Sequence, residues 1–559
     1  MQMIRASVLA FAAQGRTIRA LGALIVVVFA AAWARYVLGP VPLDVNDTRW
    51  LWGDLSQVHT AWRQYLADPD VAWLASTRMS YPLPLSISLF DPMPLLLLLA
   101  RPLASFADPG TQYFGYYFVA CLALQGVFGY MATLSALTRV GAREGIAPVL
   151  LAILSAVLIA SVPYTFYRFQ GHTALSSQWV LVLSIWVTLA TLDERTVRWY
   201  LVNCGVVLLA TGLNPYLALM VCISGGLMTL LRVSVLGRGE VARRLVAMAL
   251  VAAIGLALFG FIGGSTAHSG GYGVYSMNLL GPFDSHGIAR LLPLDVPDAT
   301  GGQVFEGYTY LGAGILMLGA VSLLAFVNHR GAANRFPFLP ALAIVVLCVV
   351  LAISATVTLA SHSLEIPIPR AVTYLLSRFR GSGRFFWMAG FWLVLLCVCA
   401  CALRFGVRRA TALLTVVVAV QIADISTIGT NVRETIASGS ALRIDGIPAG
   451  NYSAVLVYPA WQCDHEHTPA GGVRNYEAVG DLAARLNVPT NNFYAARTPA
   501  DQTAYHCDYD ARFATVDPHA LYLVSGQVYA SRGEALRLSH ECSLLTEGQD
   551  EWKCIPKAN

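Results

Sequence analysis

The sequence predicts an α-helical polytopic membrane protein with about 11 transmembrane helices and a small C-terminal extracytoplasmic α/β domain. Of its 559 residues, 56% are hydrophobic and only 12% are charged, whereas ordinary soluble domains are about 25% charged. The mean hydropathy is +0.59. Apolar runs of about 20 residues, the length that crosses a bilayer as a helix, recur along the chain.

Eleven of these apolar runs are predicted to be spans. Residues 21–33 also resemble the apolar core of a signal peptide, but the run reaches Leu38 and many spans follow, which favours a first transmembrane helix. Residues 1–425 are therefore predicted to form a transmembrane domain. Its spans cover residues 18–38, 112–137, 147–164, 175–192, 198–213, 214–232, 243–264, 309–328, 338–360, 383–404 and 409–425.

Arginines in the short loops predict the orientation. Because basic loops stay in the cytoplasm, the N-terminus is predicted to lie inside and the C-terminus outside. This arrangement explains the net charge of +5 without nucleic acid as a partner. The basic loops are TRVGAREG (138–145), DERTVR (193–198), RVSVLGRGEVARR (232–244), NHRGAANR (328–335) and RFGVRR (404–409).

One further apolar run, PMPLLLLLARPLASF (92–106), does not fit this alternation. The run is short and interrupted by proline, and a span here would place five basic loops outside. We therefore interpret it as a re-entrant or interfacial helix on the outer face rather than as a true span.

Residues 426–559 are predicted to form the periplasmic domain. SAVLVYPAW (453–461) and ALYLVSGQVYA (520–530) are rich in β-branched and aromatic residues and predict strands, while YEAVGDLAARL (476–486) predicts a helix. Four of the eleven cysteines fall in this region, and an even number in an oxidising compartment indicates two disulfides. Three pairings are possible, and a zinc site is the alternative, although no CxxC pair is present. We favour Cys463–Cys507 and Cys542–Cys554.

The predicted outer loops, residues 39–111, 165–174, 265–308 and 361–382, contain nearly every unusual polar side chain. Carboxylates there could deprotonate a hydroxyl. His172 is more often a hydrogen-bonded structural residue in such a place, and Glu306 could pair with an arginine or bind an acceptor sugar. The acidic and neutral candidates are Asp54, Gln57, Asp91, His172, Glu306 and Tyr308.

Four arginines near the outer surface also need an explanation, because arginine at that depth is costly without an anionic partner. Arginine binds phosphate bidentately, so a lipid phosphate is one candidate partner. Snorkelling to ordinary headgroups is the alternative for each of them. They are Arg168, Arg378, Arg380 and Arg384.

Taken in order, several segments resemble an uncharacterised bacterial family of integral-membrane glycosyltransferases grouped with the GT-C superfamily. The resemblance covers most of residues 40–400. It implies a polyprenyl-phosphate-linked sugar donor, an active site on the outer face, and a catalytic aspartate in the first outer loop. Asp54 matches that position best, and Asp91 or another outer carboxylate would be the second acidic group. The segments are GDLSQ (53–57), YPLPLSISLFDPMPLLLLL (81–99), RFQGHTALSSQW (168–179), EGYTYLGAG (306–314) and FRGSGRFFW (379–387).

Each aspartate also has a simpler reading. Asp54 could be the N-cap of the helix that follows it, and Asp91 could be an N-cap with Pro92 at the first helical position. Some members of the superfamily use a divalent cation such as Mg²⁺ or Mn²⁺ held by carboxylates, and others do not. No fixed ligand spacing decides the matter here.

The sequence therefore predicts an inverting membrane glycosyltransferase of a bacterial inner membrane. It would transfer a sugar to an acceptor glycan or glycolipid, such as a lipopolysaccharide component, on the periplasmic side, with Asp54 as general base. A transporter or flippase of a lipid-linked sugar is the alternative, and it would be expected to carry ionisable groups within its spans and an internal repeat. A non-catalytic scaffold is a third possibility, and it predicts that Asp54 can be changed freely.

Overall fold

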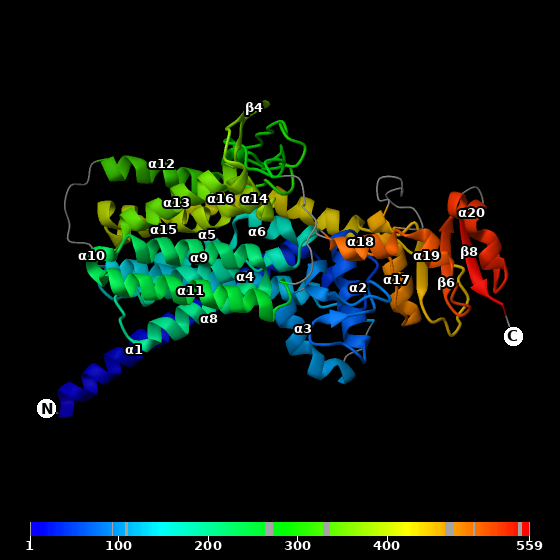
Figure 1. Cartoon of the computed structure of the whole chain (residues 1–559). Helices are drawn as coiled ribbons and strands as arrows, with labels where there is room; N and C mark the ends of the chain where they lie inside the picture. Colours follow the sequence, from blue (N-terminus) through cyan, green and yellow to red (C-terminus); the bar gives the residue numbers. More distant parts are fainter. Residues whose placement is uncertain are drawn as a thin grey trace.

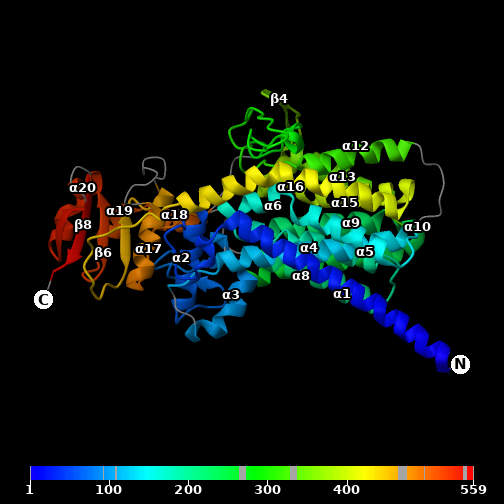
Figure 2. The same ribbon diagram turned by 180° about the vertical axis from the view of Figure 1, so that it is seen from behind.

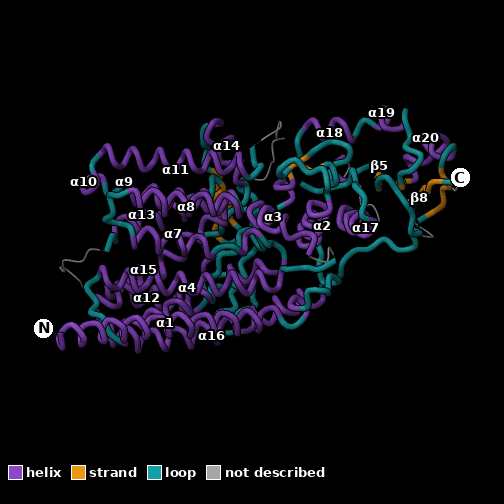
Figure 3. The backbone as a smooth tube through the Cα atoms, turned by 90° about the horizontal axis from the view of Figure 1, so that it is seen from below, coloured by secondary structure: helices purple, strands orange, loops and turns teal. Residues whose placement is uncertain are grey.

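The computed structural model describes residues 2–91, 93–106, 110–262, 272–327, 336–463, 475–495, 498–545 and 550–557, without the side chains of residues 2–14, 105–106 and 325–327. Pro92, the basic loop at 328–335 and the beginning of the predicted loop 265–308 lie outside the described residues. The long helices of the bundle run roughly along one axis, and the two ends of the chain lie at opposite ends of the molecule (Figure 1, Figure 3).

A helix lies on each predicted span. Within the described residues, five helices are long and apolar enough to cross a membrane, and α5 with its bent continuation makes a sixth. The chain is a multi-pass membrane protein. The helices are α1 (Gln2–Leu38), α4 (Phe114–Arg139), α5 (Ile146–Ala160), α7 (Trp179–Ala190), α8 (Val197–Leu213), α9 (Pro215–Leu230), α11 (Arg238–Leu258), α12 (Ala313–Val327), α13 (Phe338–Ile353), α15 (Phe386–Phe405) and α16 (Val407–Ser438).

The helices of the bundle differ in how much of their surface is buried: α15 is central and α11 is peripheral. Of the apolar window in residues 382–405, which contains α15, 78% is buried, against 22% in α11. Val246, Leu250 and Ile254 of α11 are more than half exposed. An apolar surface of this kind is typical of a helix that faces lipid, because lipid imposes no cost on exposed apolar side chains.

The short connections between helices meet at the end of the bundle near the N-terminus, where α10 (Val233–Leu236) also lies (Figure 1). Asp193 forms ion pairs of 2.8 Å with both Arg139 and Arg232. The Arg195 guanidinium donates to the carbonyl of Val235. Three of the basic loops are therefore at the same end, as the alternation of charge requires.

The opposite end, which we call the α2 end, carries the long connections. At seven residues, α3 is about 10 Å long, too short for a hydrocarbon core about 30 Å thick. It packs against α8 and α2. The short elements here are α2 (Asp54–Ala67), β1 (Ala75–Ser76), β2 (Leu85–Ser86), α3 (Pro94–Ala100), α6 (Pro163–Phe166), β3 (Thr356–Leu359), β4 (His362–Glu365) and α14 (Arg370–Leu376).

Several span boundaries differ from the prediction by a few residues, and two of the differences change the fold. The helix expected over 338–360 ends at Ile353, and the next residues form β3, which pairs with β4 in an antiparallel hairpin. Thr356–Leu359 is rich in β-branched residues, so strand geometry suits it. The last helix continues past residue 425 to Ser438 and leads out of the bundle into the C-terminal region (Figure 2).

The C-terminal region contains a four-stranded sheet in the order β5-β6-β8-β7. β5 and β6 are parallel, and the other pairs are antiparallel. All four residues of β5 are buried, because α17 packs on one face of the sheet and α20 on the other. The elements are β5 (Val455–Tyr458), α17 (Tyr476–Leu486), α18 (Ala500–His506), α19 (Tyr509–Phe513), β6 (Leu521–Ser525), α20 (Gly526–Arg537), β7 (His540–Leu544) and β8 (Glu551–Pro556).

The strand predicted over 520–530 is only half correct. β6 ends at Ser525, whose hydroxyl accepts a hydrogen bond from the amide of Val528 and caps α20. A serine followed by glycine ends the strand, since serine is among the favoured N-caps. The favoured disulfide pairings are those seen, Cys463–Cys507 and Cys542–Cys554.

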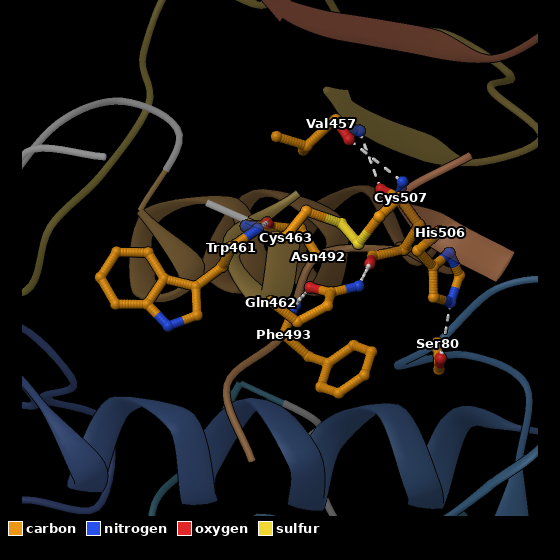
Figure 4. The surroundings of a disulfide bond; sticks show 10 residues. Ser80, Val457, Trp461, Gln462, Cys463, Asn492, Phe493, His506 and Cys507 are labelled. Carbon is orange, nitrogen blue, oxygen red and sulfur yellow. Dashed lines mark hydrogen bonds between the residues drawn. A yellow bond between two sulfur atoms is a disulfide. The ribbon is translucent and has the colours of Figure 1, made fainter. Parts of the chain in front are cut away.

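The C-terminal region is attached firmly to the α2 end. Next to the Cys463–Cys507 bond, His506 faces the hydroxyl of Ser80 at 2.9 Å (Figure 4). Gln64 of α2 donates to the carbonyl of Val488 at 2.9 Å. These contacts join α2 and the loop that follows it to the C-terminal region.

Candidate active site

A buried charge cluster at the α2 end centres on the carboxylate of Glu306. Arg384 donates to both of its oxygens, from Nε at 2.8 Å and from Nη2 at 2.6 Å. His172 Nε2 lies 3.0 Å from Oε1, and Arg168 Nη1 lies 3.4 Å from Oε2. Three cationic side chains from two separate segments, one with Arg168 and His172 and the other with Arg384, therefore converge on one carboxylate. We call these four side chains and Asp54 the Glu306 cluster.

Backbone contacts hold the segments of the cluster in place. Arg168 also donates to the carbonyls of Phe305 and Glu306. The amide of Gly383 donates to the carbonyl of Tyr275 at 3.0 Å. A Cβ at Gly383 would lie 2.9 Å from the Cα of Gly307. The two backbone segments can therefore approach closely only because both positions are glycine, and this approach brings Arg384 and Glu306 together.

We expect Gly307→Ala to disturb this approach. Its added Cβ would lie 2.4 Å from the carbonyl oxygen of Ser276, and backbone shifts of this kind typically cost about 1–3 kcal/mol. Thermal unfolding in detergent should show a lower midpoint. Gly205→Ala in α8 is the matched control, because a Cβ there meets nothing within 4 Å. Equal midpoints for the two variants would contradict the tight approach.

Asp54 joins the cluster through His172. Its Oδ2 lies 3.1 Å from Nδ1 of His172, and its side chain is 38% exposed, against 16% for Glu306. The N-cap of α2 is Gly53, and Asp54 is the first helical residue. The capping role considered for Asp54 is therefore wrong, and its carboxylate is the most accessible one of the cluster.

Asp91 lies close to the cluster and is more buried. It accepts a hydrogen bond of 3.3 Å from Asn214, which caps α9. The N-cap of α3 is Met93, so the capping role considered for Asp91 is also wrong. Asp91 instead has a left-handed backbone, with φ of 60°, after a short 3₁₀ turn. Burial raises the pKa of its carboxyl to about 6, with Asp54 adding to the rise.

His172 is held as a cation between two carboxylates. Burial alone would lower its pKa, but the charges of Glu306 and Asp54 outweigh burial and raise the pKa to about 9. Burial would raise the pKa of Glu306, but Arg384 and His172 hold that pKa well below its usual range. At neutral pH the imidazolium therefore lies between the ionised carboxylate of Glu306 and the side chain of Asp54.

This raised pKa predicts a pH dependence of stability. The folded pKa of His172 is about 9 and the unfolded one about 6.5, so the stabilisation is complete below about pH 6.5 and is lost as the pH rises through about 9. Thermal unfolding midpoints should fall over that window. His172→Gln, which carries no titrating group, should show a flatter profile, and parallel profiles would contradict the assignment.

The structure places two of the other candidates away from the charged groups of the cluster. The amide of Gln57 donates to the carbonyl of Tyr494 and accepts from the amide of the same residue at 3.3 Å, so it holds the C-terminal region to α2. Tyr308 is 1% exposed and its ring stacks on Tyr167, with centroids 4.2 Å apart. Both side chains have packing roles that the sequence does not reveal.

The four candidate arginines fall into two groups. Arg168 is completely buried, so the prediction that it contacts a membrane phosphate is wrong. Its guanidinium instead holds the segment that carries Glu306. Arg384 pairs with the same carboxylate. Arg378 donates to the hydroxyl of Tyr374 at 2.5 Å, and Arg380 lies over the ring of Tyr275 at 5.4 Å. Arg378 and Arg380 lie on the segment just before Arg384.

Sequence reasoning missed the contributions of the C-terminal region. Glu477, at the start of α17, accepts a hydrogen bond of 2.5 Å from the amide of Gly53, next to Asp54. The ring of Tyr476 lies 5.0 Å from that of Trp461 and 5.4 Å from that of Tyr494. The sequence predicted the helix at 476–486, which is α17, but nothing in the sequence shows that this helix packs on α2.

The fold and the cluster define a multi-pass membrane protein with a charged site at one end of its helical bundle. The fold is similar to that of the arabinofuranosyltransferase AftD from Mycobacteria, with a TM-score of 0.50 and 12% identity, over 97% of this chain and 40% of that chain. This chain thus spans well under half the length of that protein.

Two further solved structures are similar. One is the archaeal oligosaccharyltransferase AglB from Archaeoglobus fulgidus, with a TM-score of 0.44 and 11% identity, over 96% of this chain and 74% of that chain. The other is ArnT from Cupriavidus metallidurans, with a TM-score of 0.39 and 13% identity, over 95% and 97%.

Family models match the chain in both of its parts. Residues 27–426 match the model described as a domain of unknown function, DUF6311, and residues 445–549 match the DUF6311 C-terminal domain. The chain belongs to the DUF6311 family. No curated protein sequence matches it.

Proposed function

We propose that this protein is a membrane glycosyltransferase that moves a sugar from a polyprenyl-phosphate donor to an acceptor glycan or glycolipid on the periplasmic face of a bacterial inner membrane. The observation that supports this most directly is Asp54. It is a partly exposed carboxylate at the junction of the bundle and the C-terminal region, held 3.1 Å from the buried cation of His172. The similarity of the fold to AftD agrees with this class of enzyme.

The proposed reaction is an inverting single displacement. Asp54 accepts the proton of an acceptor hydroxyl, whose oxygen attacks the anomeric carbon while the bond from that carbon to the donor phosphate breaks. The phosphate leaves as an anion and needs no acid, but it gains from nearby positive charge. Among the described residues, the cluster sets the three cations Arg168, Arg384 and His172 against the carboxylates of Glu306 and Asp54. Whenever the nearby Asp91 is protonated, one positive charge is therefore in excess.

Arg378 and Arg380 are the proposed contacts to the donor phosphate. They lie just before α15, at the edge of the bundle, and the side chain of Arg380 is only partly buried. Arg380 also interacts with Tyr494 of the C-terminal region. A phosphate bound there would lie beside the C-terminal region, and arginine can bind it bidentately.

The C-terminal region is the proposed acceptor side. The rings of Trp461, Tyr476 and Tyr494 form a group of aromatics. Burial raises the pKa of the Tyr476 hydroxyl, and the charge of Asp54 adds to the rise. Aromatic faces suit the apolar faces of sugar rings while their polar edges hydrogen-bond. An acceptor sugar stacked on this group would present a hydroxyl to Asp54.

The test is transfer of labelled sugar from polyprenyl phosphate to native membrane glycans, with the full chain in membranes or detergent. Transfer by the wild type supports the proposal. A transporter or flippase, the alternative function, would move the intact lipid-linked sugar across a vesicle membrane without releasing polyprenyl phosphate. That outcome would replace the proposed function.

A further inference from the structure

We propose that Asp284, His286 and Asp295 form a binding site for a divalent transition-metal cation, Zn²⁺ or Mn²⁺, in the connection between α11 and α12. One ligand atom from each of the three side chains lies within 4.8 Å of the others. We call this group the Asp284 site. It shares no residue with the Glu306 cluster, and it is inferred independently of the proposed transfer reaction.

The hydrogen bonds of His286 prepare its Nδ1 for a cation. Nε2 lies 2.9 Å from the carbonyl oxygen of Val304, and only a protonated Nε2 can donate there, which leaves the lone pair of the neutral ring on Nδ1. That Nδ1 lies 3.1 Å from Oδ2 of Asp284. A metal-bound histidine typically donates its second N–H to a backbone carbonyl in this way.

The two oxygens of Asp284 have different roles. Oδ1 accepts hydrogen bonds from the amides of His286 at 2.8 Å and Val296 at 3.2 Å, so it fixes the turn. Oδ2 faces the imidazole. Asp284 is 5% exposed, and a buried carboxylate oxygen facing an imidazole lone pair is unfavourable unless a cation or a proton lies between them.

A second observation comes from Tyr308, which lines the same cavity as Asp284 and His286. Its ring lies 5.2 Å from that of His286. The side chain is 1% exposed, and its hydroxyl has no hydrogen-bond partner among the described residues. A buried unpaired hydroxyl is costly. The cavity has room of about 10 Å³, enough for about one water-sized particle, so a water bound to the cation would give the hydroxyl a partner.

The ligand types favour a transition metal. Imidazole suits Zn²⁺ and related ions, whereas Ca²⁺ and Mg²⁺ prefer oxygen ligands alone. One imidazole with two carboxylates is a set that Zn²⁺ accepts, with water in the fourth position. Asp295 is exposed, so the cation has a path from solvent.

A cation here would stabilise the segment that carries Glu306. His286 contacts the carbonyl of Val304, and Arg168 donates to the next carbonyl, that of Phe305. A metal that fixes the imidazole would therefore fix residues 304–306. The Asp284 site is thus a positioning site and contributes no group to the reacting atoms.

The test measures Zn²⁺ binding directly, without an activity assay. The full chain, purified in detergent without a polyhistidine tag and stripped with a chelator, is titrated with Zn²⁺ and, separately, with Mn²⁺ by calorimetry. We expect one strong site. Asp295→Asn should weaken it at least about tenfold, and so should His286→Asn, because asparagine tolerates the φ of 52° at that position. Glu365→Gln, on exposed β4, is the matched control and should bind like the wild type.

Thermal unfolding separates loss of the site from loss of the fold. Without metal, Asp295→Asn should unfold like the wild type, because its side chain is exposed and has no hydrogen bond in the described part of the chain. With Zn²⁺, the midpoint of the wild type should rise and that of Asp295→Asn should rise less. If neither metal binds, or if binding is as strong in both site variants as in the control, the Asp284 site does not exist.

Discussion

Replacing Asp54 by asparagine is expected to lower sugar transfer at least about 100-fold, because a positioned general base contributes about 10²–10⁴-fold. Asparagine keeps the size of the side chain but cannot accept the acceptor's proton. The fold should survive the change, since Asp54 makes no capping hydrogen bond and is 38% exposed. The measurement is the initial rate of transfer of labelled sugar, normalised to the amount of folded protein.

Asp70→Asn is the matched control for this prediction. Asp70 lies just after α2 and is exposed, so its replacement changes the same charge near the same helix. Transfer should be unaffected in that variant. Undiminished transfer in Asp54→Asn would remove Asp54 from the role of base, and the next carboxylates to test would be Asp91 and Glu306.

The helices of the bundle could be predicted because their signal is local. An apolar run of sufficient length needs no tertiary information to form a helix in a membrane, since every backbone group must be satisfied within the segment. The predictions were wrong where the local composition favours one structure and tertiary contacts impose another. Residues 354–360 are apolar enough to extend a span, yet Thr356–Leu359 within them pair with His362–Glu365 as a hairpin. Likewise, Gly526 begins a helix inside a pattern that predicts a strand.

The residue types of the candidate site could be predicted, and pairing with an arginine was one of two expectations for Glu306, but the particular partners could not be predicted. Asp54 was singled out by its place in the resemblance, Glu306 and His172 as polar residues of the predicted outer loops, and Arg384 because arginine near the outer surface is costly. Their sequence positions do not show that Glu306 neutralises Arg384 and His172, because this pairing depends on how three distant segments pack. For the same reason Arg168 was expected to face lipid phosphate, although it is completely buried.

Glu306→Gln is expected to destabilise the protein by about 3–5 kcal/mol, because removing one partner of a buried ion pair leaves the others without compensation. Glutamine has the shape of glutamate, so packing changes little. Arg384, His172 and Arg168 would then share a neutral amide, and the side chain of Arg384 is only 13% exposed to water. The measurement is the free energy of unfolding from denaturant titrations in detergent, with Glu365→Gln as the exposed control, expected within about 0.5 kcal/mol of the wild type.

A double-mutant cycle separates lost pairing from lost packing. If the cost of Glu306→Gln comes from an uncompensated Arg384, then adding Arg384→Gln should cost much less in the Glu306→Gln background than in the wild type, with a coupling of at least about 1 kcal/mol. Additive losses would mean that the two side chains act independently, in conflict with hydrogen bonds of 2.8 and 2.6 Å between them. Strong coupling would show that Glu306 is the counterion of the cluster, which leaves Asp54 as the carboxylate available to an acceptor.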